Sequence, residues 1–158
     1  MKFKRPDLSR IINLKSSTAT KGTPCSQGGI TDDKGNAPYV FDLETLGRAN
    51  LAYRRVIWTG KHMQIALMHI PADEDIGWEV HNGGDQLVLI TDGTAEVFLG
   101  GKENAPAVKK TAGEGSGIMI PSGTLHNIRN TGREPLKLVS IYAPPEHPYG
   151  SVNESRDD

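Results

Sequence analysis

Two stretches of this 158-residue chain carry side chains that are able to bind a metal ion or to move a proton. The first contains Glu79 and His81, followed by the neighbours Asp85 and Gln86, and the second contains His126 directly after a Pro-Ser-Gly-Thr-Leu segment. Neutral imidazole nitrogens and carboxylate or amide oxygens are ligands of divalent first-row metals, and histidine also exchanges protons near neutral pH. These residue types indicate a metal centre or an acid–base site, with a plain hydrogen-bonded network as the structural alternative.

Extended segments next to tight turns are expected to position these groups. Residues i and i+2 of a strand face the same side, so Glu79 and His81 should point together. The Gly-Gly pair at 83–84 supports a chain reversal, after which Gln86 begins an alternating face. If that face is the inner one, these three side chains converge with His126, which should begin a strand after its Pro-x-Gly corner.

Strand-like runs extend along most of the chain. They occupy residues 53–58, 62–70, 79–81, 85–90, 94–99, 107–111, 118–120, 125–130 and 136–142. Glycine turns separate them, and Asp92-Gly93 is a hairpin signal. A series of short strands without intervening helices predicts an all-β antiparallel sandwich or barrel.

The two stretches also match known motifs in their spacing. The second has the pattern Gly-x5-Pro-x-Gly-x2-His-x3-Asn, with Gly115, Pro121, Gly123, His126 and Asn130 at its fixed places. The first has the spacing of His-x-His-x4-Glu-x6-Gly, with Glu79, His81, Gln86 and Gly93 at those places. In these residues the chain resembles the cupin superfamily, and within it the small single-domain bacterial cupins loosely described as mannose-6-phosphate isomerase-like.

The resemblance implies an antiparallel double-sheet β-barrel, the cupin or jelly-roll fold, with an N-terminal extension. It also implies a divalent transition metal (Fe, Mn, Ni or Zn) held by Glu79, His81, Gln86 and His126. The usual family set is three histidines and one glutamate, so one nitrogen donor is replaced here while one negative charge is kept. Asp85 is the competing ligand because the motif also tolerates a shorter spacing. Gln86 is preferred since it keeps the six-residue step to the glycine.

Three classes of function follow from the resemblance. The first is a metal-dependent enzyme acting on a small molecule, an isomerase or a dioxygenase, with Glu79, His81 and His126 as catalytic groups. The second is a non-catalytic module that binds or senses a sugar-like ligand. The third is a metal-free sugar-processing cupin in which His81 or His126 acts as the base, and the retained carboxylate–amide pair argues against it.

The chain is expected to form one domain. Residues 1–50 form an N-terminal extension, partly flexible, with a short helix that begins at Asp42 as N-cap and is stopped by Gly47. Residues 51–150 form the barrel, and residues 151–158 form a frayed tail. Cupins commonly pair through sheet edges and N-terminal arms, so a homodimer is expected.

Charge and composition exclude other classes of partner. Eighteen basic and nineteen acidic side chains give a formal net charge of −1, so no nucleic acid or anionic membrane is expected as a partner. No apolar run is long enough to span a membrane or to act as a signal peptide, and a cytoplasmic location is the default expectation. The lone Cys25 is interpreted as an inert surface thiol.

Further candidates are weaker. His62 and His69 are interpreted as surface and strand-end residues. Arg54, Arg55 and Lys61 near Trp58 are able to hold an anionic group, although a solvated or interface position is favoured. The Pro-rich segment 142–147 must leave the sheet, so that it either closes the barrel mouth with Tyr142, Glu146 or His147, or simply finishes the domain, which is slightly favoured.

Overall fold

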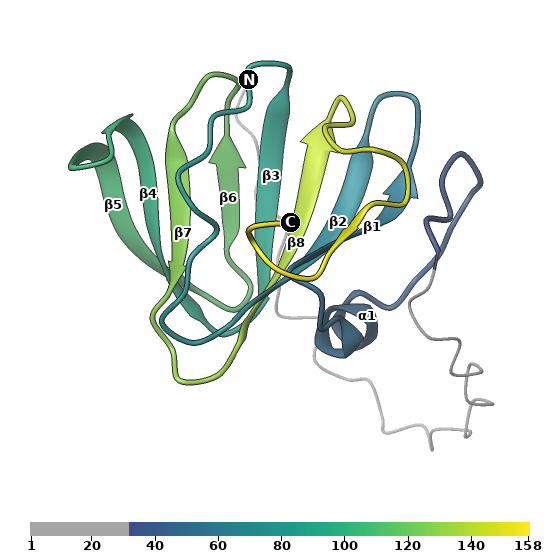
Figure 1. Cartoon of the computed structure of the whole chain (residues 1–158), viewed down its shortest axis with the longest axis horizontal. Helices are drawn as coiled ribbons and strands as arrows, with labels where there is room; N and C mark the ends of the chain where they lie inside the picture. The colour runs from purple at the N-terminus through teal and green to yellow at the C-terminus, as the bar shows by residue number, and fades with distance from the viewer. Residues whose placement is uncertain (1–31) are drawn as a thin grey trace, which may run out of the picture.

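The computed structural model describes residues 32–158, and Cys25 together with most of the predicted N-terminal extension lies outside them. The elements are α1 (Leu43–Ala49), β1 (Arg54–Thr59), β2 (Gln64–Ile70), β3 (Asp85–Asp92), β4 (Thr94–Lys102), β5 (Ala105–Gly113), β6 (Gly117–Ile120), β7 (His126–Asn130), β8 (Leu136–Ala143) and β9 (Val152–Asn153). Figure 1 shows the strands side by side, with α1 at one end of the array.

The strands form two antiparallel sheets. One sheet has six strands in the order β6-β3-β8-β2-β1-β9, and the other has three in the order β5-β4-β7. The predicted all-β, double-sheet jelly-roll architecture is confirmed. No helix among residues 32–158 combines the length and the apolar character that a membrane span requires.

The Asp92-Gly93 turn is not the hairpin that the sequence suggests. It joins β3 to β4, but β3 pairs with β6 and β8 whereas β4 pairs with β5 and β7. The chain therefore turns a corner from one sheet to the other. Gly93 has a φ of 94°, and a Cβ there would lie 3.2 Å from the Leu136 backbone, so a side chain would strain the backbone and crowd β8.

The space between the sheets is the main core. Alternate side chains of β2, β3, β6, β7 and β8 fill it, including Met68, Val88, Ile118, Ile128 and Leu138. On β3, Gln86, Val88 and Ile90 are buried while Leu87 and Leu89 are half-buried, which confirms the predicted inner face. Burying each such aliphatic side chain contributes about 1.5–3 kcal/mol.

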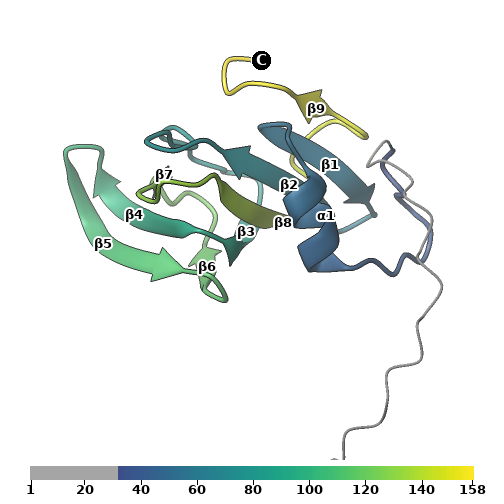
Figure 2. The same ribbon diagram turned by 90° about the horizontal axis from the view of Figure 1, so that it is seen from below.

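Helix α1 covers the outer face of the larger sheet. Figure 2 shows it lying against that sheet, where Leu43 and Leu46 pack with Phe41 on a second buried cluster around Leu67 and Val139. Asp42 caps the helix as predicted, because its Oδ1 accepts a hydrogen bond of 2.6 Å from Thr45 N–H.

The predicted stop at Gly47 is wrong. The helix continues to Ala49, and Gly47 is buried. A Cβ at Gly47 would lie 3.2 Å from Thr91 Oγ1, so the glycine lets the helix approach β3 closely.

The C-terminal segment, predicted to be a frayed tail, contains the short strand β9, which pairs with β1. Arg156 Nη1 in this segment lies 2.8 Å from Asp75 Oδ1.

Candidate metal centre

Glu79, His81 and His126 come together at the inner face of the three-stranded sheet. His126 is the first residue of β7, as predicted, and it exchanges two backbone hydrogen bonds with Glu79, of 3.0 and 2.9 Å. Figure 1 shows the connection between β2 and β3 running alongside β7. Glu79 lies on this connection in an isolated bridge with His126, and His81 follows two residues later. The strand expected at residues 79–81 does not form, because Glu79 pairs with β7 and not with β3.

The ligating atoms of these three residues face one another. One donor atom from each lies within 4.8 Å of the others. Glu79 Oε2 is 3.4 Å from His81 Nε2 and 3.9 Å from His126 Nε2. The His126 side chain is completely buried, and those of Glu79 and His81 are 23% and 13% exposed, so the group is largely shielded from water.

Both imidazoles are held by their other nitrogen. His126 Nδ1 lies 2.9 Å from the Thr124 carbonyl oxygen, and His81 Nδ1 lies 3.1 Å from Glu146 Oε1. Because a carbonyl oxygen only accepts hydrogen bonds, Nδ1 of His126 is the donor to Thr124, and the carboxylate of Glu146 favours the same role for Nδ1 of His81. The Nε2 atom of the neutral ring then carries the free lone pair and faces the centre. Neither Nε2 has a hydrogen-bond partner among the described residues, although both are buried.

Gln86 supplies a third buried acceptor without a partner. Its Nε2 donates a hydrogen bond of 2.6 Å to Ser140 Oγ on β8, which leaves Oε1 buried and unpaired among the described residues. Asp85 is exposed, and its Oδ1 accepts a hydrogen bond of 2.9 Å from Ser122 N–H. The two candidate ligands therefore face opposite sides of β3, and Gln86 is the one on the barrel side.

Arg54 reaches the same centre from β1. Its Nη2 lies 3.3 Å from Glu79 Oε1, so the two oxygens of this carboxylate face different partners. Burial opposes the charged carboxylate, but the contact with His81 and the positive charge of Arg54 hold the pKa of Glu79 below its ordinary value. Glu79 is thus anionic, as a metal ligand must be.

The two histidines differ in their protonation. Burial lowers the pKa of His126, so its ring is neutral at neutral pH. The contact with Glu79 raises the pKa of His81, against the effect of burial, and Glu146 adds to the rise. Protonation of His81 competes with a metal at its Nε2, so metal binding is expected to weaken as the pH falls.

The Pro-rich segment 142–147 lies at this site, contrary to the slightly favoured expectation. Besides the contact of Glu146 with His81, the Tyr142 ring packs edge-on against His81, with centroids 5.6 Å apart, and against His147, at 4.9 Å. Burial raises the pKa of Tyr142 to about 12, and burial with the nearby Arg54 lowers that of His147 to about 4. Both groups are neutral at neutral pH.

Sequence reasoning underestimated Arg54, which it assigned to a solvated or interface position. The strand pattern could have indicated its inward position. Arg54 and Val56 are two residues apart on β1 and so share a face, and Val56 is buried.

Among the weaker candidates, His62 is exposed as predicted. His69 is not a solvated tip. Its Nδ1 lies 2.7 Å from Lys137 Nζ on β8, and Lys137 also donates a hydrogen bond to the Asn50 carbonyl oxygen after α1. This pair fastens the helix to the sheet, on the face opposite to the centre.

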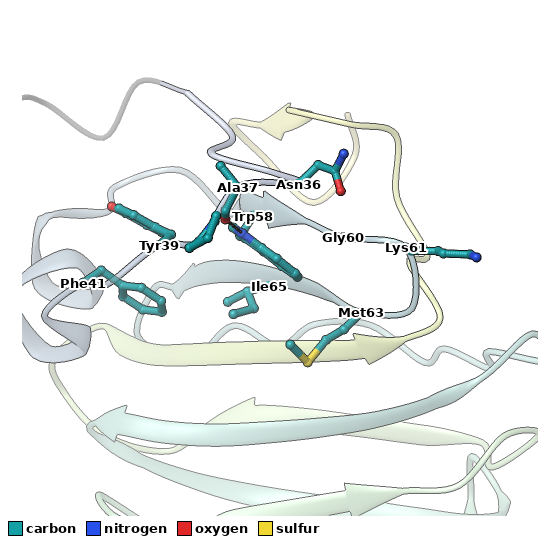
Figure 3. Close-up of a pocket in the computed structure, with 10 residues that line it drawn as sticks. Asn36, Ala37, Tyr39, Phe41, Trp58, Gly60, Lys61, Met63 and Ile65 are labelled. Atoms are coloured by element: carbon teal, nitrogen blue, oxygen red, sulfur yellow. Dashed lines mark hydrogen bonds between the residues drawn. The ribbon is translucent and has the colours of Figure 1, made fainter.

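A separate groove of about 450 Å³ lies on the outer face of the sheet. Figure 3 shows its aromatic lining, in which Tyr39 and Phe41 stand on one side and Trp58 on the other, with Lys61 at its edge. Trp58 Nε1–H donates a hydrogen bond of 2.9 Å to the Ala37 carbonyl oxygen. The groove shares no residue with the Glu79, His81 and His126 group. Lys61 lines the groove whereas Arg54 contacts Glu79, so the less favoured alternative, in which these cations hold one anionic group, is not supported.

Comparisons with known proteins identify the family to which this two-sheet β-barrel belongs. A family model described as a cupin domain matches residues 66–142. The uncharacterised protein YrkC of Bacillus subtilis (strain 168) is 41% identical over 129 residues, which are 82% of this chain and 69% of that protein. The uncharacterised protein L612 of Acanthamoeba polyphaga mimivirus is 38% identical over 122 residues, 77% of this chain and 74% of that protein.

A solved structure extends the comparison. The crystal structure of BH2720 from Bacillus halodurans is 43% identical, with a TM-score of 0.77, and the match covers 80% of this chain and 96% of that one. This chain belongs to the cupin superfamily. Cupins commonly bind metal, and the Glu79, His81 and His126 group is positioned to hold one.

Proposed function

We propose that this protein is a metal-dependent cupin that binds a divalent first-row transition metal through Glu79, His81, Gln86 and His126, and that it acts on a small molecule in the barrel. One observation carries the proposal. Three buried acceptor atoms, His81 Nε2, His126 Nε2 and Gln86 Oε1, have no hydrogen-bond donor among residues 32–158. Unpaired buried acceptors are costly, and a cation satisfies them together.

The donor set favours oxygenase chemistry over isomerisation. Two imidazoles and one carboxylate resemble the set that non-haem iron oxygenases use, with positions left for substrate and dioxygen. Such a metal would supply electron transfer to dioxygen when bound. The chain's own residues would hold it, orient the substrate and exclude water, and Arg54 lies close enough to Glu79 to attract an anionic substrate group.

Isomerisation, suggested by the resemblance to mannose-6-phosphate isomerase-like cupins, needs a proton carrier beside the metal. If Glu79, His81 and His126 are all ligands, that carrier must be another group. Glu146 is the nearest carboxylate, and its side chain is 33% exposed. Because the donor set favours oxygenase chemistry, we expect Fe first among the candidate metals, followed by Mn, Ni and Zn.

A non-catalytic binding module is the second candidate. When His81 is protonated, Arg54, Glu79, His81 and Glu146 form a chain of alternating charge, with contacts of 3.3, 3.4 and 3.1 Å. Such a chain is electrostatically balanced without a cation, so a polar pocket for a sugar-like ligand is consistent with the same side chains.

Elemental analysis of untagged protein purified without chelator tests the proposal. We expect close to one metal ion per chain, lost in His81→Ala and in His126→Ala and retained in the control His62→Ala, which alters an exposed histidine. Oxygen consumption by the Fe(II)-loaded protein with candidate substrates then distinguishes an oxygenase from a binding module. Absence of metal, even after reloading, contradicts the proposal and favours the metal-free pocket.

A further inference from the structure

Residues 143–147, here called the strap, connect β8 to the C-terminal segment and bring Glu146 into contact with His81. Gln64 on β2 holds the strap in place. Its Oε1 accepts hydrogen bonds from Glu146 N–H at 3.3 Å and His147 N–H at 2.9 Å, and its Nε2 donates one of 2.9 Å to the His147 carbonyl oxygen. Gln64 is completely buried, so these bonds are shielded from water.

The strap is also packed directly on the loop that follows His81. A Cβ at Gly84 would lie 2.3 Å from the Ala143 carbonyl oxygen and 2.5 Å from Pro144 Cδ. Only glycine permits so close an approach. The strap is thus fixed from two sides, by Gln64 beneath it and by the backbone of this loop.

The fixed backbone delivers Glu146 to the outer nitrogen of His81. The two atoms, Glu146 Oε1 and His81 Nδ1, are 3.1 Å apart, whereas His81 Nε2 makes only a 3.4 Å contact with Glu79 Oε2. The better hydrogen bond is therefore the one on the outside of the ring. A carboxylate in this position keeps the ring proton on Nδ1 and leaves the Nε2 lone pair for the centre.

We propose that Glu146, anchored by Gln64, is a positioning residue that fixes the Nδ1–H tautomer and the orientation of His81. This inference rests on the proposed metal site for its purpose, but the tautomer itself is a property of the chain. It assigns a role to a half-exposed glutamate that lies 65 residues from its histidine in sequence.

The test uses the full chain with isotope-labelled histidine. Nitrogen chemical shifts, recorded without metal at a pH well above the raised pKa of His81, report which ring nitrogen carries the proton. We expect Nδ1–H in the native protein and in Glu146→Gln, whose amide oxygen still accepts the hydrogen bond. We expect a shift toward Nε2–H in Glu146→Ala and in Gln64→Leu, which releases the strap while Glu146 remains.

Metal affinity is the second readout. Loss of an outer partner of a ligating histidine typically weakens metal binding about 10- to 100-fold, and we expect such a loss in Glu146→Ala and a smaller one in Glu146→Gln. Glu103→Gln, at an exposed glutamate in the β4–β5 turn, is the matched control and should change neither readout.

The outcomes separate this inference from the proposed function. An identical His81 tautomer in the native protein and in Glu146→Ala overturns the inference, whether or not metal binds. A native protein that takes up no metal but shows the tautomer shift in Glu146→Ala supports the positioning role and contradicts the metal proposal. Both the shift and the affinity loss support the two together.

Discussion

At the scale of single residues, the centre is defined by which atom of each side chain is already occupied. His126 gives its Nδ1 to the Thr124 carbonyl, His81 gives its Nδ1 to Glu146, and Gln86 gives its amide nitrogen to Ser140. Each side chain is thereby turned so that its remaining acceptor faces inward. Preorganisation of this kind allows a metal to bind without reorienting its ligands.

Substitutions of Gln86 and Asp85 should have different effects on metal affinity. We expect Gln86→Ala to lower metal affinity, because it removes a buried oxygen on the barrel side of β3. We expect Asp85→Ala to leave the affinity unchanged, since Asp85 is exposed and bonded to the Ser122 backbone. Competition with a chromophoric chelator measures both constants. If Asp85→Ala strips the metal while Gln86→Ala does not, the assignment of the ligand to Gln86 is wrong.

At the scale of elements, the site is built from three segments that are far apart in the sequence. The β2–β3 connection supplies Glu79 and His81, β7 supplies His126, and the strap supplies Glu146. Close contact between the connection and the strap holds this arrangement together, and the two glycines of the connection differ sharply in how close they lie to the strap.

Gly84 and Gly83 offer a matched pair of substitutions. Gly84→Ala would drive its Cβ into backbone atoms of Ala143, so we expect it to displace the strap and to cost about 1–3 kcal/mol of unfolding free energy. Gly83→Ala would meet only Glu146 Oε2, at 4.0 Å, and should be nearly neutral. Urea unfolding measures both variants. Equal stabilities of the two would show that the strap is not packed on this loop.

At the scale of the whole molecule, stability depends on keeping several titratable groups neutral inside or beside the barrel. His147 is the clearest case, with a pKa lowered from 6.5 to about 4 by burial and by Arg54. Its folded state binds a proton less readily than its unfolded state. The neutral ring therefore contributes stability above pH 6.5 that is lost as the pH falls toward 4.

We expect the free energy of unfolding to fall with decreasing pH in this window, by at most about 1.4 kcal/mol per pH unit from this one group. The slope is smaller in practice because the ring is only half-buried and partly screened by water. His147→Phe should reduce the slope while keeping the packing on Tyr142. Urea unfolding at several pH values, with chelator present, provides the measurement. The same slope in both proteins would contradict the assignment to His147.

Self-association is a second property of the whole molecule. We expect a homodimer, and the described surface offers a place for it at the two ends of α1, where Val40 is 96% and Leu51 is 75% exposed. Removing such apolar surface from water favours association. Leu51→Glu should therefore lower the molar mass measured by light scattering, whereas His62→Glu, at an exposed residue of the β1–β2 turn, should not. A monomeric native protein would contradict the expectation.

Residue spacing alone predicted the all-β fold, the inner face of β3, the Asp42 cap and the convergence of Glu79 and His81 with His126. These features depend on local rules: strand alternation, turn chemistry and side-chain preference at a helix start. The predicted hairpin at Asp92–Gly93 was wrong for a related reason. Turn residues specify that the chain bends, but not which sheet the next strand joins.

The tertiary structure alone decided the surroundings of the site. Arg54 on β1 of the six-stranded sheet reaches Glu79, which pairs with β7 of the three-stranded sheet, because the two sheets face each other. Glu146 reaches His81 because Gln64 holds the strap after β8. None of these pairs has a spacing that a sequence motif records, since each joins segments that meet only after both sheets have formed. Which side chains could ligate a metal is therefore local information, whereas their charge, tautomer and exposure are set by long-range packing.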